Sequence, residues 1–195
     1  MKKNGLSLIE LIIVIFILSL IMAIGMPSFW RFYSAMSLKN QVSFIVSKMK
    51  TIRYEAISKH ISHGILFYEV KKEWYYIIVK DGNSNGIWIE DIKNGIDKIA
   101  EGPYSCNQEG FSKIGILNNN IPEIPPDQGY LDANKPVQFG KSGIFACSSG
   151  GSCSPGTIYF MSKSISCMQA IRVYAPTSRF SIWSYCETSG WHKKW

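Results

Sequence analysis

One stretch near the N-terminus constrains this chain more than any other, because it carries no charge over the length of a bilayer. The segment from Leu11 to Trp30 has no ionisable side chain, and between Lys3 and Arg31 the only such residue is Glu10. A helix of twenty residues is about 30 Å long, which matches the hydrocarbon thickness of a membrane. Since Lys2 and Lys3 precede the span, we expect the N-terminus in the cytoplasm and everything after Trp30 outside it.

Three interpretations of this N-terminus compete. A secretory signal has an apolar region of about 7–15 residues that ends at small residues such as Ala23 and Gly25, but this run is longer and begins beside Glu10. A plain signal anchor fits the length and gives no reason for a carboxylate that costs about 2.5–3.5 kcal/mol to insert. The third interpretation is cleavage after Gly5, which makes Glu10 the fifth residue of the mature chain.

The third interpretation is favoured by a resemblance. The segment Gly5-Leu6-Ser7-Leu8-Ile9-Glu10 resembles the type IV prepilin cleavage and methylation motif, with Leu6 and Ser7 in place of the usual Phe and Thr. The resemblance implies that a prepilin peptidase removes residues 1–5 and methylates the new amino group of Leu6. It also implies that Glu10 pairs with the N-terminal amine of a neighbouring subunit, and that Pro27 lies where this family tolerates a bend.

After Pro27 the apolar residues follow a helical period. They recur at spacings of four and three, which places one face of a helix on a core: Leu38, Val42, Ile45, Met49, Ile52 and Ala56. We expect this helix to end between His60 and Gly64, with His60 and His63 at a solvated helix end rather than on a metal.

The rest of the chain predicts β structure. Two runs rich in branched and aromatic residues, 65–70 and 74–79, predict a hairpin, and shorter strands are expected near 87–92, 137–139 and 157–161. The Pro-rich segment 118–136 predicts a long surface loop. The predicted fold class is therefore α+β, with a long helix packed on an antiparallel sheet as in the pilin family.

This fold divides the chain into four parts. They are a leader (1–5), the transmembrane half of the helix (6–30), its amphipathic half (31–62) and an extracytoplasmic β-rich domain (63–195).

The segment Asp81-Gly82-Asn83-Ser84-Asn85-Gly86 has two interpretations. Oxygen ligands at alternate positions, here Asp81, Asn83 and Asn85, resemble the start of a calcium loop, but position twelve is Ile92 where that loop needs Glu. A tight turn rich in Asp and Asn between two strands explains the same residues and is the favoured interpretation. A similar turn occurs in the H-type pseudopilin and FimT-like subfamily of minor pilins.

Five cysteines can form disulfides if the domain lies outside the cytoplasm. The turn signal at 175–178 predicts a hairpin in which opposed residue numbers sum to 353, so Cys167 faces Cys186 at a distance that a disulfide allows. The same register gathers Ile171, Val173, Phe180 and Ile182 on one face. Cys147 and Cys153 bracket a short flexible loop that a second disulfide would close, which leaves Cys106 free or intermolecular.

The predicted hairpin carries a second, more diffuse resemblance. The segments 137–143 and 171–179 are similar to paired C-terminal motifs of the H-type pseudopilin and FimT-like subfamily. Some FimT-like proteins bind DNA through a Gly-Arg-x-Arg element, whereas this chain has Ser178-Arg179-Phe180-Ser181 and lacks the second arginine.

A DNA-binding role therefore stays open as an alternative. The net charge of +7 becomes about +5 without Lys2 and Lys3, a modest excess that allows an acidic partner without requiring one. The residues that could contact DNA are Arg172, Arg179, Lys193 and Lys194. An exposed amphipathic tail, or a tail docked on another subunit, is the favoured interpretation of 191–195.

The sequence gives no catalytic motif and implies no cofactor, so we expect a subunit rather than an enzyme. Expected partners are other pilin or pseudopilin subunits, prepilin peptidase and the inner-membrane assembly platform. The leader is shared by type II secretion pseudopili, type IV pili and DNA-uptake pili, so it does not choose among these machines.

Overall fold

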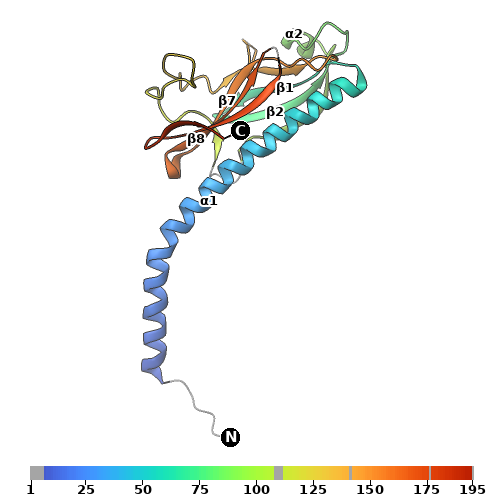
Figure 1. The fold of residues 1–195 in the computed structure, drawn as a ribbon. Helices are drawn as coiled ribbons and strands as arrows, with labels where there is room; N and C mark the ends of the chain where they lie inside the picture. Colours follow the sequence, from blue (N-terminus) through green and yellow to red (C-terminus); the bar gives the residue numbers. More distant parts are fainter. Residues whose placement is uncertain (1–6, 108–111, 141, 176, 195) are drawn as a thin grey trace.

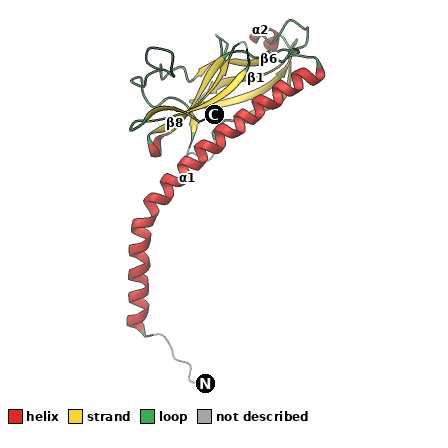
Figure 2. Ribbon diagram, viewed as in Figure 1, coloured by secondary structure: helices red, strands yellow, loops and turns green. Residues whose placement is uncertain are grey.

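The computed structural model describes residues 7–194 apart from 108–111, 141 and 176. One helix dominates it: α1 runs from Leu8 to Lys59, continues through Pro27 and curves gently (Figure 1). Its lower half projects away from the rest of the chain, whereas its upper half lies along the strands (Figure 2). His60 ends the helix in a left-handed conformation, within the range predicted for its end.

Two antiparallel sheets form the globular domain. The first has the order β3-β2-β1-β6 and the second the order β10-β9-β8-β7-β4, with β5 also paired to β7. The strands are β1 (His63–Val70), β2 (Glu73–Lys80), β3 (Lys98–Ser105), β4 (Lys113–Ile114), β5 (Val137–Gln138), β6 (Ile144–Cys147), β7 (Gly156–Ser162), β8 (Cys167–Tyr174), β9 (Arg179–Cys186) and β10 (Gly190–Lys193). A short helix, α2 (Ile89–Lys93), and one 3₁₀ turn, η1 (Lys163–Ile165), complete the elements. The predicted α+β class, a long helix packed on antiparallel strands, is confirmed.

The core lies between α1 and the inner faces of both sheets. The predicted helical face is buried there, from Leu38 to Ala56, against residues of β1, β2, β6, β7, β8 and β9. The largest fully buried side chains include Phe139, Phe145 and Phe160. One helical face therefore joins two sheets into one domain, because each sheet buries its apolar side on the same helix.

The outer face of each sheet is covered by a segment that connects two strands. Ile121, Ile124 and Leu131 pack on the outer side of the second sheet, in one cluster with Tyr159 and Met168. The prediction of a surface loop over 118–136 was thus wrong in part: the segment lacks regular strands, but its apolar residues are buried. Proline and asparagine spacing predicted the irregular backbone and gave no indication of the face that the loop would cover.

The segment 87–92 was predicted as a strand, but its residues from Ile89 onward lie in α2. The backbone N–H groups of Ile92 and Asn94 donate to the carbonyl oxygens of Trp88 and Glu90, which is helical bonding. Ile87 and its neighbours pack on the outer face of the first sheet, against Ile77, Val79 and Ile144. A short apolar run fits a buried strand and a buried helical turn equally well, so its period could not decide between them.

Candidate functional site

The lower half of α1 carries most of the exposed large apolar side chains among the described residues. Every described residue from Ser7 to Tyr33 is exposed, and burial of the helix begins at Ser34. By length and composition α1 can cross a membrane. The Ser19 hydroxyl donates to the Phe16 carbonyl oxygen at 2.7 Å, so this polar group is satisfied within the helix, as a lipid environment requires.

Glu10 lies in the first turn of α1 and is exposed. Within the described residues its carboxylate has no hydrogen bond or ion pair. A carboxylate in the first turn faces the positive end of the helix dipole, which stabilises it only in part. The predicted processing residues Gly5 and Leu6 lie outside the described residues.

The turn after β2 is built around the carboxylate of Asp81. Its Oδ1 accepts the backbone N–H groups of Asn83 (3.1 Å) and Ser84 (2.7 Å), and its Oδ2 accepts that of Gly86 (2.8 Å). Asp81 is buried, so three N–H donors offset the cost of placing its charge there. This geometry explains why an aspartate begins the turn.

Two further carboxylates complete the loop. Asp97, which is buried, accepts the backbone N–H groups of Gly82 (2.9 Å) and Trp88 (3.1 Å). Asp91 Oδ2 accepts the side-chain amides of Asn83 (3.2 Å) and Asn85 (3.0 Å). No group of three or more His, Cys, Asp or Glu residues among those described could hold a metal. The hydrogen bonds support the favoured structural interpretation, and calcium binding by Asp81, Asn83 and Asn85 stays an untested alternative.

Gly82 allows this loop to close. A Cβ at Gly82 would lie 1.9 Å from the carbonyl oxygen of Ile96, so no other residue fits there without moving the backbone. The close approach brings the two ends of the loop together and places α2 over the first sheet.

The C-terminal hairpin has the predicted register. Cys167 pairs with Cys186, Ile171 with Ile182 and Val173 with Phe180. Cys167 and Cys186 form a disulfide, as do Cys147 and Cys153. Turn position and side-chain alternation were sufficient to predict this register, because a shift of one residue would have moved the apolar residues to the wrong face.

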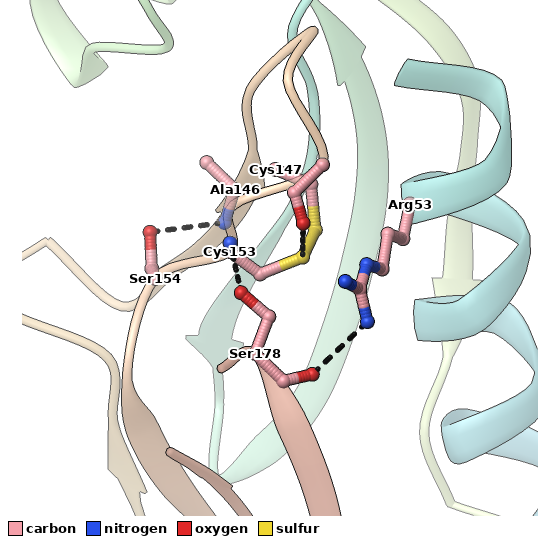
Figure 3. The surroundings of a disulfide bond; sticks show 7 residues. Arg53, Ala146, Cys147, Cys153, Ser154 and Ser178 are labelled. Carbon is pink, nitrogen blue, oxygen red and sulfur yellow. Dashed lines mark hydrogen bonds between the residues drawn. A yellow bond between two sulfur atoms is a disulfide. The ribbon is translucent and has the colours of Figure 1, made fainter. Parts of the chain in front are cut away.

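The Cys147–Cys153 loop is attached to both the hairpin and the helix. Figure 3 shows that Ser178 lies between Cys153 and Arg53. The backbone N–H of Cys153 donates to Ser178 Oγ at 2.7 Å, and Arg53 Nη1 donates to the Ser178 carbonyl oxygen at 3.2 Å. Sequence reasoning missed this junction, because no local signal pairs residues 125 positions apart in the chain.

The four predicted nucleic-acid contacts lie on or beside the C-terminal strands, and one of them differs from the others in its surroundings. Arg172 is engaged within the domain: its guanidinium donates to Asp127 Oδ2 (2.7 Å) and to the Ile124 carbonyl oxygen (3.2 Å), and it lies over the ring of Tyr174. These bonds connect the loop of residues 118–136 to β8. Arg179, Lys193 and Lys194 are exposed on β9 and around the end of β10.

Cys106 is a buried free thiol. Its burial raises the pKa of the thiol to about 12, because the thiolate would lose its hydration. The backbone around it is paired: its N–H donates to the Trp74 carbonyl oxygen at 2.8 Å, and its own carbonyl oxygen accepts a bond from the Gln41 amide on α1. The structure therefore shows Cys106 as a free thiol in the core. A free thiol was one of the two possibilities that the sequence left open.

The structure contradicts the predicted solvent exposure of His63. His60 is exposed, but His63 is fully buried, and its Nδ1 lies 2.7 Å from the Ile61 carbonyl oxygen. Its Nε2 is 3.6 Å from Glu55 Oε2. The prediction of a solvated helix end was wrong for His63 because β1 begins there and pairs it with Cys147.

Comparison with known families identifies the N-terminal segment. The prokaryotic N-terminal methylation motif matches residues 1–26. With the long exposed helix and the antiparallel domain, this match supports a type IV pilin-like protein, a class that prepilin peptidase processes and that assembles with other pilin subunits. The match ends at Met26 and does not reach the globular domain. Comparisons with curated proteins and with solved structures gave no match.

Proposed function

We propose that the chain is a minor pilin or pseudopilin of the H-type pseudopilin and FimT-like subfamily, a non-enzymatic subunit of a type II secretion pseudopilus or a type IV pilus. Prepilin peptidase cleaves after Gly5 and methylates Leu6. The subunit is held in the inner membrane by one span, with its C-terminal domain outside the cytoplasm, until the assembly platform inserts it into the fibre.

The observation that carries this proposal is the exposed apolar helix whose first part lies within the matched methylation motif. An apolar surface of this length is unstable in water, since each exposed large side chain forgoes about 1.5–3 kcal/mol of burial. A membrane covers it before assembly, and the helices of neighbouring subunits cover it in a fibre. The proposed division of the chain is a leader (1–5), a transmembrane half of the helix (6–30), its amphipathic half (31–62) and an extracytoplasmic domain (63–195).

Glu10 acts as the assembly charge in this proposal. A carboxylate on a helix among lipid tails costs about 2.5–3.5 kcal/mol on insertion scales. A cationic N-terminal amine of a neighbouring subunit offsets that cost, because opposite charges attract strongly in a medium of low dielectric constant. Within the described residues no cationic group pairs with Glu10.

Substitution of Glu10 tests the proposal. We expect Glu10→Ala to remain in the membrane fraction, because the change makes the span more apolar, and to be depleted from sheared fibres. Glu10→Gln, which keeps the size and removes the charge, should behave in the same way, while Glu187→Gln on the exposed β9–β10 turn serves as the control. Recovery of Glu10→Ala in fibres at the level of the unaltered chain would refute the proposed role of Glu10.

DNA binding during uptake is a second candidate function. It is supported by the exposed Arg179, Lys193 and Lys194, and weakened by the engagement of Arg172 with Asp127. A gel-shift assay at several salt concentrations tests it, because binding through phosphate contacts weakens steeply as the salt concentration rises. Absence of binding by the protein at low salt would exclude this role.

A further inference from the structure

Beside α2 the surface contains an open groove that the proposed function does not use. A cavity of about 700 Å³ is lined by Asn85, residues 88–91, Gly140 and Ser142. It continues into a second cavity of about 400 Å³ that shares Trp88, Gly140 and Ser142 and adds apolar residues, among them Ile87 and Phe139. Together they form a groove large enough for a short peptide segment.

Trp88 forms one wall of this groove in a fixed orientation. Its side chain is 62% exposed, and among the described residues after Trp30 it is the only exposed tryptophan. The indole N–H donates to the Asn85 carbonyl oxygen at 3.2 Å, and the backbone N–H donates to Asp97 Oδ2 at 3.1 Å. An aromatic face that is held in place loses little conformational entropy on binding, which favours a role in recognition.

The adjoining wall is negatively charged. Glu90 is exposed, and no hydrogen bond or ion pair involves its carboxylate in the part of the chain that the structure describes. Asp91 is half-buried, and its Oδ2 accepts hydrogen bonds only from the neutral amides of Asn83 and Asn85. Two carboxylates beside an exposed indole disfavour an anionic ligand and attract a cation.

We propose that this groove binds a lysine- or arginine-bearing segment of a partner protein. The aliphatic stem of the basic residue lies against the Trp88 ring and the apolar floor, and its charged group faces Glu90. A cation over an indole and a cation beside a carboxylate are both favourable, and long basic side chains present an apolar stem and a charged tip together. The proposal does not rest on the assembly role of α1.

The test uses the full chain in detergent micelles, with nitrogen-15 in the tryptophan indoles. The probe is the peptide acetyl-Gly-Arg-Gly-amide, and its citrulline counterpart has nearly the same shape without the charge. Trp88→Ala identifies the Trp88 indole signal by its loss. Because Lys141 lies between Gly140 and Ser142 in the sequence, the titration is repeated with Lys141→Gln to remove the chain's own lysine as a competitor.

We expect the Trp88 signal to shift saturably with the arginine peptide, and the affinity to be about threefold or more lower for the citrulline peptide. Glu90→Gln should weaken binding of the arginine peptide by about twofold or more. Trp88→Ala should weaken binding similarly, measured on the backbone amides of a second sample labelled uniformly with nitrogen-15. Tyr130→Ala and Glu187→Gln, an exposed aromatic and an exposed carboxylate elsewhere, should change neither.

Three results of the peptide titrations would overturn the proposal. They are equal affinity for the arginine and citrulline peptides, absence of any Trp88 shift at millimolar peptide, and tighter binding of a glutamate peptide. Self-association that Trp88→Ala abolishes and that the arginine peptide does not inhibit would assign the groove to a second copy bound by other chemistry, and would also overturn it.

Discussion

Removal of the Asp81 carboxylate tests whether the loop of residues 81–97 is a hydrogen-bonded structure or a calcium site. In Asp81→Ala, the backbone N–H groups of Asn83, Ser84 and Gly86 lose their acceptor. Hydrogen bonds to a charged group contribute about 1.5–3 kcal/mol each, and water replaces part of that at this partly exposed turn. We expect the free energy of loop opening to fall by about 2–4 kcal/mol.

Hydrogen exchange measures this loss directly. A change of about 2–4 kcal/mol corresponds to roughly 30- to 700-fold faster exchange of those three amides. Asp81→Asn keeps an oxygen for Asn83 and Ser84 and turns its amide NH2 group, a donor, toward the N–H of Gly86, so we expect a loss of about 1–2 kcal/mol with the largest effect at Gly86. Glu187→Ala, an exposed carboxylate in the β9–β10 turn, should leave exchange in the loop unchanged.

Two outcomes would refute this reasoning. If Asp81→Ala leaves the exchange of these amides unchanged, the carboxylate does not organise the loop. If a chelator accelerates their exchange in the unaltered chain and calcium reverses the effect, the loop depends on a metal and the hydrogen bonds described above are not sufficient to hold it.

Three further predictions concern contacts within the globular domain. Met49→Ala should lower the free energy of unfolding by about 2–5 kcal/mol, measured by denaturant titration, because Met49 is fully buried between α1 and the sheets; a loss under about 1 kcal/mol would contradict that packing. Cys106 should resist a maleimide at pH 8 and react on unfolding, because its raised pKa of about 12 leaves it protonated; rapid native labelling would contradict its burial. Arg172→Gln should make the segment 116–133 more sensitive to protease, because it removes the 2.7 Å ion pair with Asp127; unchanged cleavage would show that the apolar contacts alone hold that segment.

Several features could be predicted because each is decided over a short stretch of chain. The exposed helix follows from an uncharged run of bilayer length, and its buried face from apolar spacings of three and four. The hairpin of β8 and β9 follows from one turn signal and the alternation of its strands, and its register fixed the Cys167–Cys186 disulfide. Local propensity and tertiary packing agree in all of these elements.

Other features were decided only by contacts between distant segments. Whether residues 87–92 form a strand or a helical turn depended on the face of the first sheet that they cover, and the burial of Ile121, Ile124 and Leu131 depended on the second. Cys106 is a core thiol because α1 covers it. Trp88 is an exposed wall of the groove because hydrogen bonds to Asp97 and Asn85 hold it near Gly140. The sequence by itself determined the long apolar helix, the class of fold and the C-terminal register. The tertiary structure decided which polar and aromatic groups stay accessible, because burial depends on what the rest of the chain places over each residue.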